Sequence, residues 1–257
     1  MSGLSHAIAF HGTVIAGLST LAWASISPTN TLWGPLHCRG SGDGPPRYAL
    51  TFDDGPTRGS TSAVLDLLGE FGVQAAFFVI GANARQCPDL LVRMHAEGHL
   101  IANHTLDHAH LSMFRGSRYW DHQLVETDRI IGQIIGRRPA MFRPPMGMKT
   151  GFNMGAAKRA GQAVVTWSRR AMDGIATTPE RILDRLVPRT VAGDVLLLHD
   201  GVEPQSHRDP SPSIKAIKPL ILRLRDRGLE PAPLDDFLGL PAYAKAPTEV
   251  SAWSSKT

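Results

Sequence analysis

Two adjacent carboxylates end an apolar run in the sequence YALTFDDGP, residues 48–56. Asp53 and Asp54 repel each other at neutral pH unless a positive group lies beside them. Two histidines four residues apart, His104 and His108, follow in the sequence NHTLDHAHL, and in a helical turn this spacing directs both rings the same way. Two imidazoles and one carboxylate leave one position open for water, as in catalytic zinc sites. We therefore expect one acid to bind a metal with the histidines while the other stays ionised as a base.

Polar residues also follow other strand-like runs of the chain. They are Asp53–Asp54, His104, Arg143, Asp173 and His199–Asp200. About seven β–α units follow one another from Arg47 onward, which predicts a parallel sheet. In a closed barrel the strand ends meet on one face, whereas in an open sheet only the switch point forms a crevice. Polar groups at so many strand ends favour a distorted, incomplete (β/α) barrel of about seven parallel strands.

Helical patterns lie between these runs, and one of the expected helices covers residues 83–97. The chain has 257 residues, 42% of them hydrophobic and 19% charged, which is sufficient for a substantial core. Its net charge of +4 is spread along the chain, so no nucleic-acid partner is indicated. The two cysteines, Cys38 and Cys87, form no metal-binding pair. One disulfide between them is an alternative to the favoured interpretation, two buried thiols.

The beginning of the chain differs from the rest, since no Asp, Glu, Lys or Arg occurs before Arg39. We interpret residues 1–30 as an apolar segment that is a membrane anchor, a signal peptide or a packing helix. A linker over 31–46, a catalytic domain over 47–240 and a flexible tail over 241–257 follow. The segment favours membrane association or export to the cell envelope. A cytoplasmic location is the alternative, because no basic residue precedes the apolar run.

Five short motifs together resemble those of the polysaccharide deacetylase family, the NodB-homology domain of carbohydrate esterase family 4. TFDDGP, HTLDH, RPPMG, MDG and LLLHD occur in the order and approximate spacing of that family, over about residues 47 to 235. The first two motifs are together highly specific, and each later motif is less so. The resemblance implies the same distorted (β/α) barrel.

The resemblance implies roles for the first motifs. Asp54 would bind a divalent metal with His104 and His108. The metal would be zinc, with cobalt, nickel or manganese as alternatives. Asp53 would be the general base that takes a proton from metal-bound water, and Arg143 would pair with Asp53 and hold it ionised.

The later motifs imply the remaining catalytic groups. His199 would protonate the leaving amine, and Asp173 would orient that histidine. The backbone N–H near Met146 would stabilise the oxyanion, and Leu197 would line the slot for the acetyl methyl group. The substrate-binding residues that we expect are Pro145, Met146, Gly147, Trp167 and Leu197.

Each assignment has a structural alternative. These are a turn acid for Asp53, a surface position for Arg143, a core histidine for His199 and a turn cap for Asp173. The other histidines that we considered are interpreted as surface or structural residues: His95, His99, His110, His122 and His207.

The fourth motif departs from the family pattern D-x-x-D-W. Arg170 replaces its first acid and Gly174 its tryptophan, which normally forms a wall of the acetyl pocket. Met146 replaces the usual aromatic residue of the third motif. We expect Trp167 or Trp120 to close the slot if it is not simply wider.

The function predicted is that of a metal-dependent hydrolase. It would remove an N-linked acetyl group from an amino sugar of a polysaccharide, oligosaccharide or lipid-linked saccharide, and so act on a carbon–nitrogen bond other than a peptide bond. An O-acetyl esterase of the same fold and a catalytically weak carbohydrate-binding domain are the alternatives. An N-acetylated saccharide is the expected partner, and no protein partner is indicated.

Overall fold

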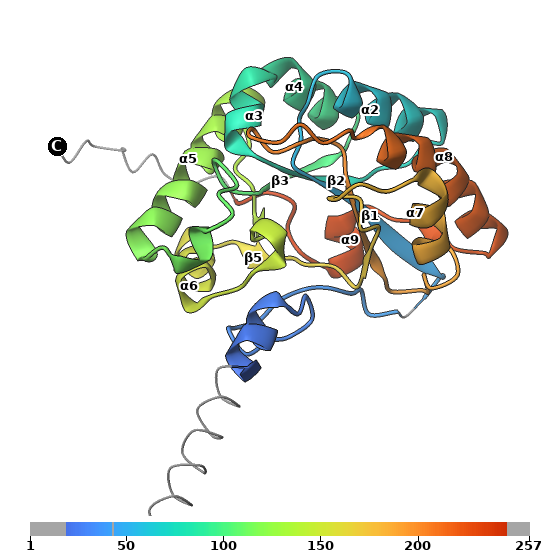
Figure 1. Cartoon of the computed structure of the whole chain (residues 1–257). Coiled ribbons are helices and arrows are strands. Elements are labelled where there is room, and N and C mark those ends of the chain that lie inside the picture. Colours follow the sequence, from blue (N-terminus) through green and yellow to red (C-terminus); the bar gives the residue numbers. More distant parts are fainter. Residues whose placement is uncertain (1–18, 43, 246–257) are drawn as a thin grey trace, which may run out of the picture.

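A computed structural model describes residues 19–42 and 44–245 of the chain. Parallel strands form one sheet in the order β5-β4-β3-β2-β1-β7-β6, and β8 pairs with β1. The strands are β1 (Arg47–Asp53), β2 (Ala76–Val79), β3 (Leu100–Asn103), β4 (Met141–Phe142), β5 (Ala163–Val164), β6 (Arg169–Arg170), β7 (Val195–His199) and β8 (Glu230–Pro231). The sheet curves into part of a barrel, which confirms the predicted distorted (β/α) barrel with about seven parallel strands (Figure 1).

Helices cover the outer face of this curved sheet (Figure 1). They are α2 (Ser60–Glu70), α3 (Gly81–Gln86), α4 (Pro88–Ala96), α5 (Ser117–Ile135), α6 (Gly151–Ala160), α7 (Pro179–Leu186) and α8 (Ser211–Asp226). The short helix α9 (Leu234–Leu238) packs on the inner side instead, where Leu234 belongs to a cluster with Ala49 and Phe78. The expected helix over 83–97 is in fact two helices, α3 and α4. Pro88 causes the division, because it lacks the N–H that a continuous helix needs and begins α4 as its first residue.

The main core lies between the central strands and the helices α2 and α8. Leu50 of β1, Leu65 and Leu68 of α2, and Leu220 and Leu224 of α8 belong to one buried cluster. Burying such a side chain contributes about 1.5–3 kcal/mol. This packing fixes β1, and therefore the carboxylates at its end, in the middle of the molecule.

The segment before β1 lies across the open side of the barrel. His37 forms a bridge to Val165, just after β5, and Arg39 forms a bridge to Asp194, just before β7. This segment therefore joins the two sides of the sheet that the strand order leaves unpaired. The predicted boundaries of linker and domain stay predictions.

The predicted apolar segment 1–30 is described only from residue 19. Residues 19–26 form a helix, and the Ser25 carbonyl accepts a hydrogen bond from the Lys149 N–H at 2.9 Å. Within residues 19–42 and 44–245, no helix combines the length and the apolar character needed to cross a membrane. Cys38 and Cys87 are both free thiols, the first half-buried and the second buried.

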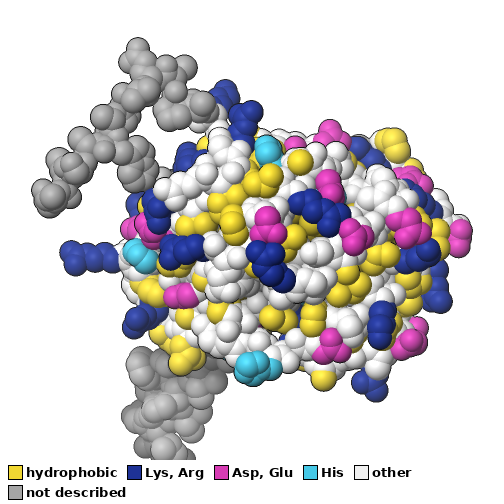
Figure 2. Space-filling view, turned by 90° about the horizontal axis from the view of Figure 1, so that it is seen from above, with side chains coloured by type: hydrophobic (Ala, Val, Ile, Leu, Met, Phe, Trp, Pro, Cys, Tyr) yellow, Lys and Arg dark blue, Asp and Glu magenta, His cyan; other side chains and the backbone are white. Residues whose placement is uncertain are grey.

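The face of the molecule in Figure 2 carries basic, acidic and hydrophobic side chains interspersed with one another. Mixed charge of this kind is the ordinary surface of a soluble domain. It agrees with the low net charge of the sequence.

Candidate active site

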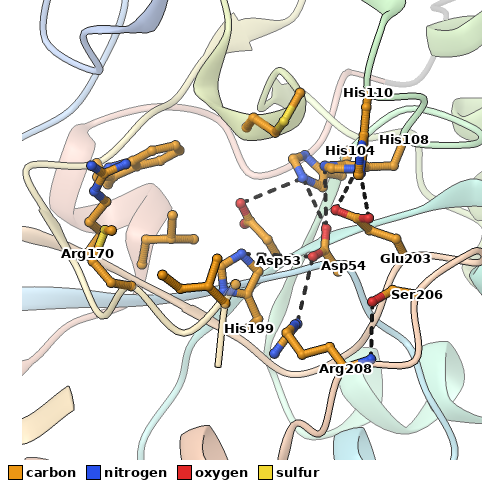
Figure 3. A pocket seen from close by; sticks show the side chains of 16 residues that line it. Asp53, Asp54, His104, His108, His110, Arg170, His199, Glu203, Ser206 and Arg208 are labelled. Atoms are coloured by element: carbon orange, nitrogen blue, oxygen red, sulfur yellow. Dashed lines mark hydrogen bonds and ion pairs between the residues drawn. The ribbon is translucent and has the colours of Figure 1, made fainter. Parts of the chain in front are cut away.

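A pocket of about 450 Å³ lies at the carboxyl ends of the strands (Figure 3). Asp53 is the last residue of β1, His104 follows β3, and His199 is the last residue of β7. All three line the pocket, and Arg143, which follows β4, lies beneath it against Asp53. Since parallel strand ends converge in a barrel, residues distant in sequence meet here.

Asp54 and the two predicted histidines lie together. The Asp54 Oδ1 atom is 3.5 Å from His104 Nε2 and 3.6 Å from His108 Nε2. This carboxylate oxygen is buried and has no hydrogen-bond partner among the described residues. Burial alone would raise the pKa of Asp54, but His104, His108 and His199 outweigh it and lower that pKa. The carboxylate is therefore ionised and faces two imidazole nitrogens.

This arrangement fits a divalent metal. Ligand atoms about 2 Å from one tetrahedral zinc ion lie about 3.3 Å from one another, close to the two distances given above. The His104 Nδ1 atom lies 2.8 Å from the Arg143 carbonyl oxygen, so it carries the proton and leaves Nε2 free to bind a metal. Asp54, His104 and His108 thus offer one carboxylate and two nitrogen donors.

The loop after β3 brings the histidines together in a way that the sequence did not predict. We expected a helical turn, and this was wrong, because Thr105 and His108 have φ values of 72° and 51°. Asn103 Oδ1 accepts the Thr105 N–H at 2.9 Å, and Thr105 Oγ1 accepts the His108 N–H at 3.2 Å. Side chains of the loop therefore hold its left-handed residues in place.

Glu203, which sequence reasoning missed, holds the outer side of His108. Its Oε1 atom lies 3.2 Å from His108 Nδ1, and its Oε2 atom lies 2.6 Å from His110 Nε2. The hydrogen bond with His108 is the main cause that lowers the pKa of Glu203. His110, predicted to be a surface or structural residue, is indeed exposed but lines the pocket (Figure 3).

These three residues form a second group that could hold a metal. It shares His108 with the first group, but it lies nearer the surface. Glu203 comes from the loop after β7, about 95 residues from His108, and no motif marks it.

Asp53 is fixed by Arg143. The Arg143 Nη1 atom donates to Asp53 Oδ1 at 2.6 Å and to Thr51 Oγ1 at 3.0 Å, and the guanidinium lies 3.8 Å from the centre of the Phe78 ring. Arg143 is fully buried, and this burial lowers its pKa against the opposing effect of Asp53. The second oxygen of Asp53 lies 3.7 Å from His104 Nε2 and so faces the metal-ligand group.

His199 is oriented by Asp173. Its Nδ1 atom lies 2.8 Å from Asp173 Oδ1, while Asp173 Oδ2 accepts hydrogen bonds from the His199 N–H and from Ser213 Oγ. Burial favours the neutral ring, but Asp173 outweighs burial and raises the pKa of His199 to about 9. The Nε2 atom lies 3.8 Å from Asp54 Oδ2, so the protonated ring directs its second N–H into the pocket.

Three of the five expected substrate-binding residues line the pocket, namely Met146, Trp167 and Leu197. Pro145 and Gly147 are buried and do not line it. Gly147 has a φ of 68°, and a Cβ atom there would lie 2.5 Å from the Trp167 ring. Gly147 therefore allows the tryptophan to approach the backbone.

The wall near the fourth motif is open. Gly174 and Ile175 line the pocket, and the Ile175 side chain is 60% exposed. Trp167 is present at the pocket, as we expected, whereas Trp120 is buried in a separate cluster with Phe142. Trp120 therefore does not close the slot.

Arg208 is a second residue that sequence reasoning missed. It donates to the carbonyl oxygens of Asp173 at 2.9 Å and Gly201 at 2.7 Å, and its Nη2 atom is 4.0 Å from Asp54 Oδ2. It ties the loop after β7 to the loop that carries Asp173.

Comparison with known proteins identifies the family. A sequence model of the family "Polysaccharide deacetylase" matches residues 41–165. A chitooligosaccharide deacetylase of Sinorhizobium fredii is 38% identical over 196 residues, which cover 73% of this chain and 90% of that protein. The chain belongs to the polysaccharide deacetylase family. A peptidoglycan-N-acetylglucosamine deacetylase of Bacillus cereus is 32% identical and covers 70% of this chain and 64% of its own length.

Solved structures agree with the family assignment. A peptidoglycan N-acetylglucosamine deacetylase superposes with a TM-score of 0.75 at 27% identity, covering 81% of this chain and 95% of the other. A family pseudoenzyme of Bacillus anthracis has a TM-score of 0.70 at 19% identity, covering 78% and 68%, which shows the fold alone. As a polysaccharide deacetylase, the protein is a hydrolase of the N-acetylglucosamine deacetylase type, which acts on carbon–nitrogen bonds other than peptide bonds.

Proposed function

We propose that this polysaccharide deacetylase is a metal-dependent enzyme that removes the acetyl group from N-acetylglucosamine residues of an envelope glycan. The observation that carries the proposal is the position of Asp53 and His199. The free oxygen of Asp53 lies 3.7 Å from His104 Nε2, and the Nε2 atom of His199 lies 3.8 Å from Asp54 Oδ2, so both face the group formed by Asp54, His104 and His108 (Figure 3). A base and an acid around three metal ligands are what amide hydrolysis requires.

Asp54, His104 and His108 would hold the metal. When bound, a divalent metal polarises the amide carbonyl and lowers the pKa of water from about 15.7 towards 7. Zinc suits a set of two imidazoles and one carboxylate, and cobalt, nickel and manganese are the alternatives to be tested. Glu203 supports the set by placing its Oε1 atom 3.2 Å from His108 Nδ1, where the carboxylate favours a proton on that nitrogen and so leaves Nε2 as the donor.

Asp53 acts as the general base in this proposal. Its Oδ1 atom is occupied by Arg143, so only Oδ2 can receive a proton from the attacking water. The buried guanidinium holds Oδ1 by a hydrogen bond of 2.6 Å, so Oδ2 stays directed at the metal-ligand group. Arg143 thus positions the base without touching the substrate.

His199 acts as the general acid. Asp173 keeps its ring protonated, so the Nε2 proton is available to the leaving amine of the sugar. The backbone N–H of Met146, which lines the pocket with a φ of 54°, is assigned to the developing oxyanion. Trp167 and Leu197 enclose the acetyl methyl group.

The names of the relatives support the substrate class. Chitooligosaccharides and peptidoglycan both contain N-acetylglucosamine, and the peptidoglycan deacetylases support an envelope location for this chain. Membrane association through residues 1–30 is part of the proposal. Fractionation of full-length protein tests that part, and recovery wholly in the soluble cytosol with an intact N-terminus would contradict it.

Acetate release tests the chemistry. We expect release from N-acetylated chitotetraose or from peptidoglycan, loss of that release after chelation, and recovery with one equivalent of zinc. Acetylated xylan is the control for ester hydrolysis. Release from xylan alone would make the protein an O-acetyl esterase, and full activity without metal would contradict the proposal.

A further inference from the structure

Arg170 lies on the side of the pocket opposite Glu203 and His110 (Figure 3). Arg170 lines this pocket and also a neighbouring hollow of about 320 Å³. The residues of the hollow are Ser168, Arg169, Arg170, Met172, Arg185 and Arg189. The two depressions share Arg170 and Met172, so a saccharide that occupies the first can extend into the second.

The hollow carries an excess of positive charge. No Asp or Glu lines it. Arg169 is paired with Asp194 at 3.0 Å, but Arg185 donates to neutral oxygens of Ala171 and Thr177. Within residues 19–42 and 44–245, neither Arg170 nor Arg189 forms an ion pair. Three of the four guanidinium groups therefore have no carboxylate partner.

The fold brings these arginines together from two elements, β6 and the end of α7. Arg170 belongs to β6 and lies opposite Leu197 of β7, which lines the catalytic pocket. Arg185 belongs to α7, and Arg189 lies in the turn that follows this helix. Guanidinium groups bind the oxygens of carboxylates and phosphates through parallel N–H donors. A hollow that arginines line, with no acid among its lining residues, is thus suited to an oxyanion.

We propose that this arginine hollow is a subsite for an anionic group of the glycan, and that the enzyme prefers acidic saccharides. The proposal rests on the proposed deacetylase function and names its substrate class. Arg170 and Arg189 donate to the oxyanion while the N-acetyl group lies between Asp53 and His199. Arg170 stands where the family pattern has an acid, and an acid there would repel such a substrate.

Three glycans test the proposal and identify the source of the anion. Chitotetraose is neutral, hyaluronan oligosaccharides carry a carboxylate beside every N-acetylglucosamine, and poly(N-acetylglucosamine 1-phosphate) carries phosphodiesters. We expect wild-type kcat/KM for acetate release to be higher for one acidic glycan than for the neutral one. The preferred polymer then distinguishes carboxylate from phosphate.

Arg189→Gln should lower the ratio of kcat/KM between the preferred acidic glycan and chitotetraose by about 5- to 10-fold, mainly through KM. Arg170→Gln together with Arg189→Gln should lower the ratio further. Raising the salt concentration from about 0.05 to about 0.5 M should reduce the wild-type preference but not that of the double variant. Arg118→Gln is the matched control. Arg118 is an exposed arginine on α5, which lies on the opposite side of the molecule from α7 (Figure 1).

An unchanged ratio in both variants, or an equal fall in Arg118→Gln, would overturn the proposal. So would a wild-type preference for neutral chitotetraose. If no glycan releases acetate, the proposed function fails, and calorimetric binding of the acidic oligosaccharides still decides the subsite. The subsite is supported if the wild type binds the acidic oligosaccharides and Arg189→Gln weakens this binding while Arg118→Gln does not. Equal affinity in the wild type and Arg189→Gln, or no binding at all, would overturn the proposal.

Discussion

The floor and the rim of the pocket are built in different ways. The floor consists of Asp53, Asp54, His104, His108 and Arg143, whose residues are between 0% and 4% exposed. The rim consists of His110, Arg170, Gly174, Ile175 and Glu203. Of these, the His110 side chain is 61% exposed and Ile175 is 60% exposed.

From this difference we expect the floor to carry out the reaction and the rim to select the substrate. Each floor residue is held by partners from another strand end, such as Arg143 on Asp53 and the Arg143 carbonyl on His104. Such groups cannot move without leaving a buried charge or donor unsatisfied. Exposed rim residues such as Arg170 and Ile175 can change without this cost, so we expect them to set the glycan and acyl preference.

The largest effect should follow from loss of the metal ligands. His104→Ala removes one nitrogen donor and leaves the Arg143 carbonyl without its partner. Bound zinc should therefore be lost, together with at least about 10³-fold of the activity, comparable to the general loss on removing a catalytic metal or base. Metal analysis and acetate release measure both.

His122→Ala is the matched control, because His122 is an exposed histidine on α5 outside the pocket. Equal losses in the two variants would indicate general damage to the fold. Retention of zinc by His104→Ala would contradict the ligand assignment.

Glu203 tests whether a rim residue supports the floor. Glu203→Ala takes away the carboxylate that lies 3.2 Å from His108 Nδ1, and zinc affinity should fall about 10- to 100-fold. Competition with a chromogenic chelator measures the affinity directly. Glu97→Ala is the control, since Glu97 also faces a histidine, His99, but lies away from the pocket. If zinc affinity falls no further in Glu203→Ala than in Glu97→Ala, Glu203 does not support the metal site.

A buried acid near the floor of the pocket, Asp128, makes the stability of the folded protein depend on pH. Asp128 accepts hydrogen bonds from Asn103 at 2.7 Å and Gln162 at 2.8 Å, and burial raises its pKa to about 6. The folded protein thus binds a proton that the unfolded chain, with an ordinary pKa of 3.8, has already released. Stability should be lost as the pH rises from about 4 through 6.

Asp128→Asn should remove this loss and stabilise the protein at pH 8 by about 2–3 kcal/mol, but by only about 1 kcal/mol near pH 4.5. Urea unfolding at the two pH values measures it. Asp121→Asn, an exposed acid on the same helix, should change stability by less than about 0.5 kcal/mol. Destabilisation of Asp128→Asn at both pH values would contradict the assignment of this cost to the buried charge.

The smallest effect concerns the open wall at Gly174. A Cβ atom at this position would lie 3.4 Å from the nearest His199 carbon, an ordinary contact, so a side chain can be accommodated. Gly174→Trp should close the acyl slot and raise the preference for acetyl over propionyl by about three- to tenfold in kcat/KM. If the wild type already rejects propionyl amides and Gly174→Trp leaves the acetyl-to-propionyl ratio of kcat/KM unchanged, residue 174 does not line the acyl slot.

The floor was predictable because its residues stand directly after strand-like runs, and parallel strands bring their ends together. The path of the loop from His104 to His108 was not predictable, because its left-handed residues depend on hydrogen bonds with the Asn103 side chain and the Thr105 hydroxyl. No local pattern indicated Glu203 or Arg208. Both lie in the long loop after β7, and their partners are defined only once the barrel has formed.

The arginine hollow on the rim was also only partly predictable from the sequence. The sequence revealed Arg170 as a departure from the family pattern. Only the packing of α7 against β6 brings Arg185 and Arg189 to it.

The central claim is that Asp53 is the base and Asp54 a ligand. Zinc content and acetate release from the same samples of Asp53→Asn and Asp54→Asn test it most directly. Asp53→Asn should bind zinc as the wild type does and lose about 10²–10⁴-fold in kcat, while Asp54→Asn should lose zinc affinity. Loss of zinc from Asp53→Asn with retention by Asp54→Asn would reverse the two roles and contradict the account.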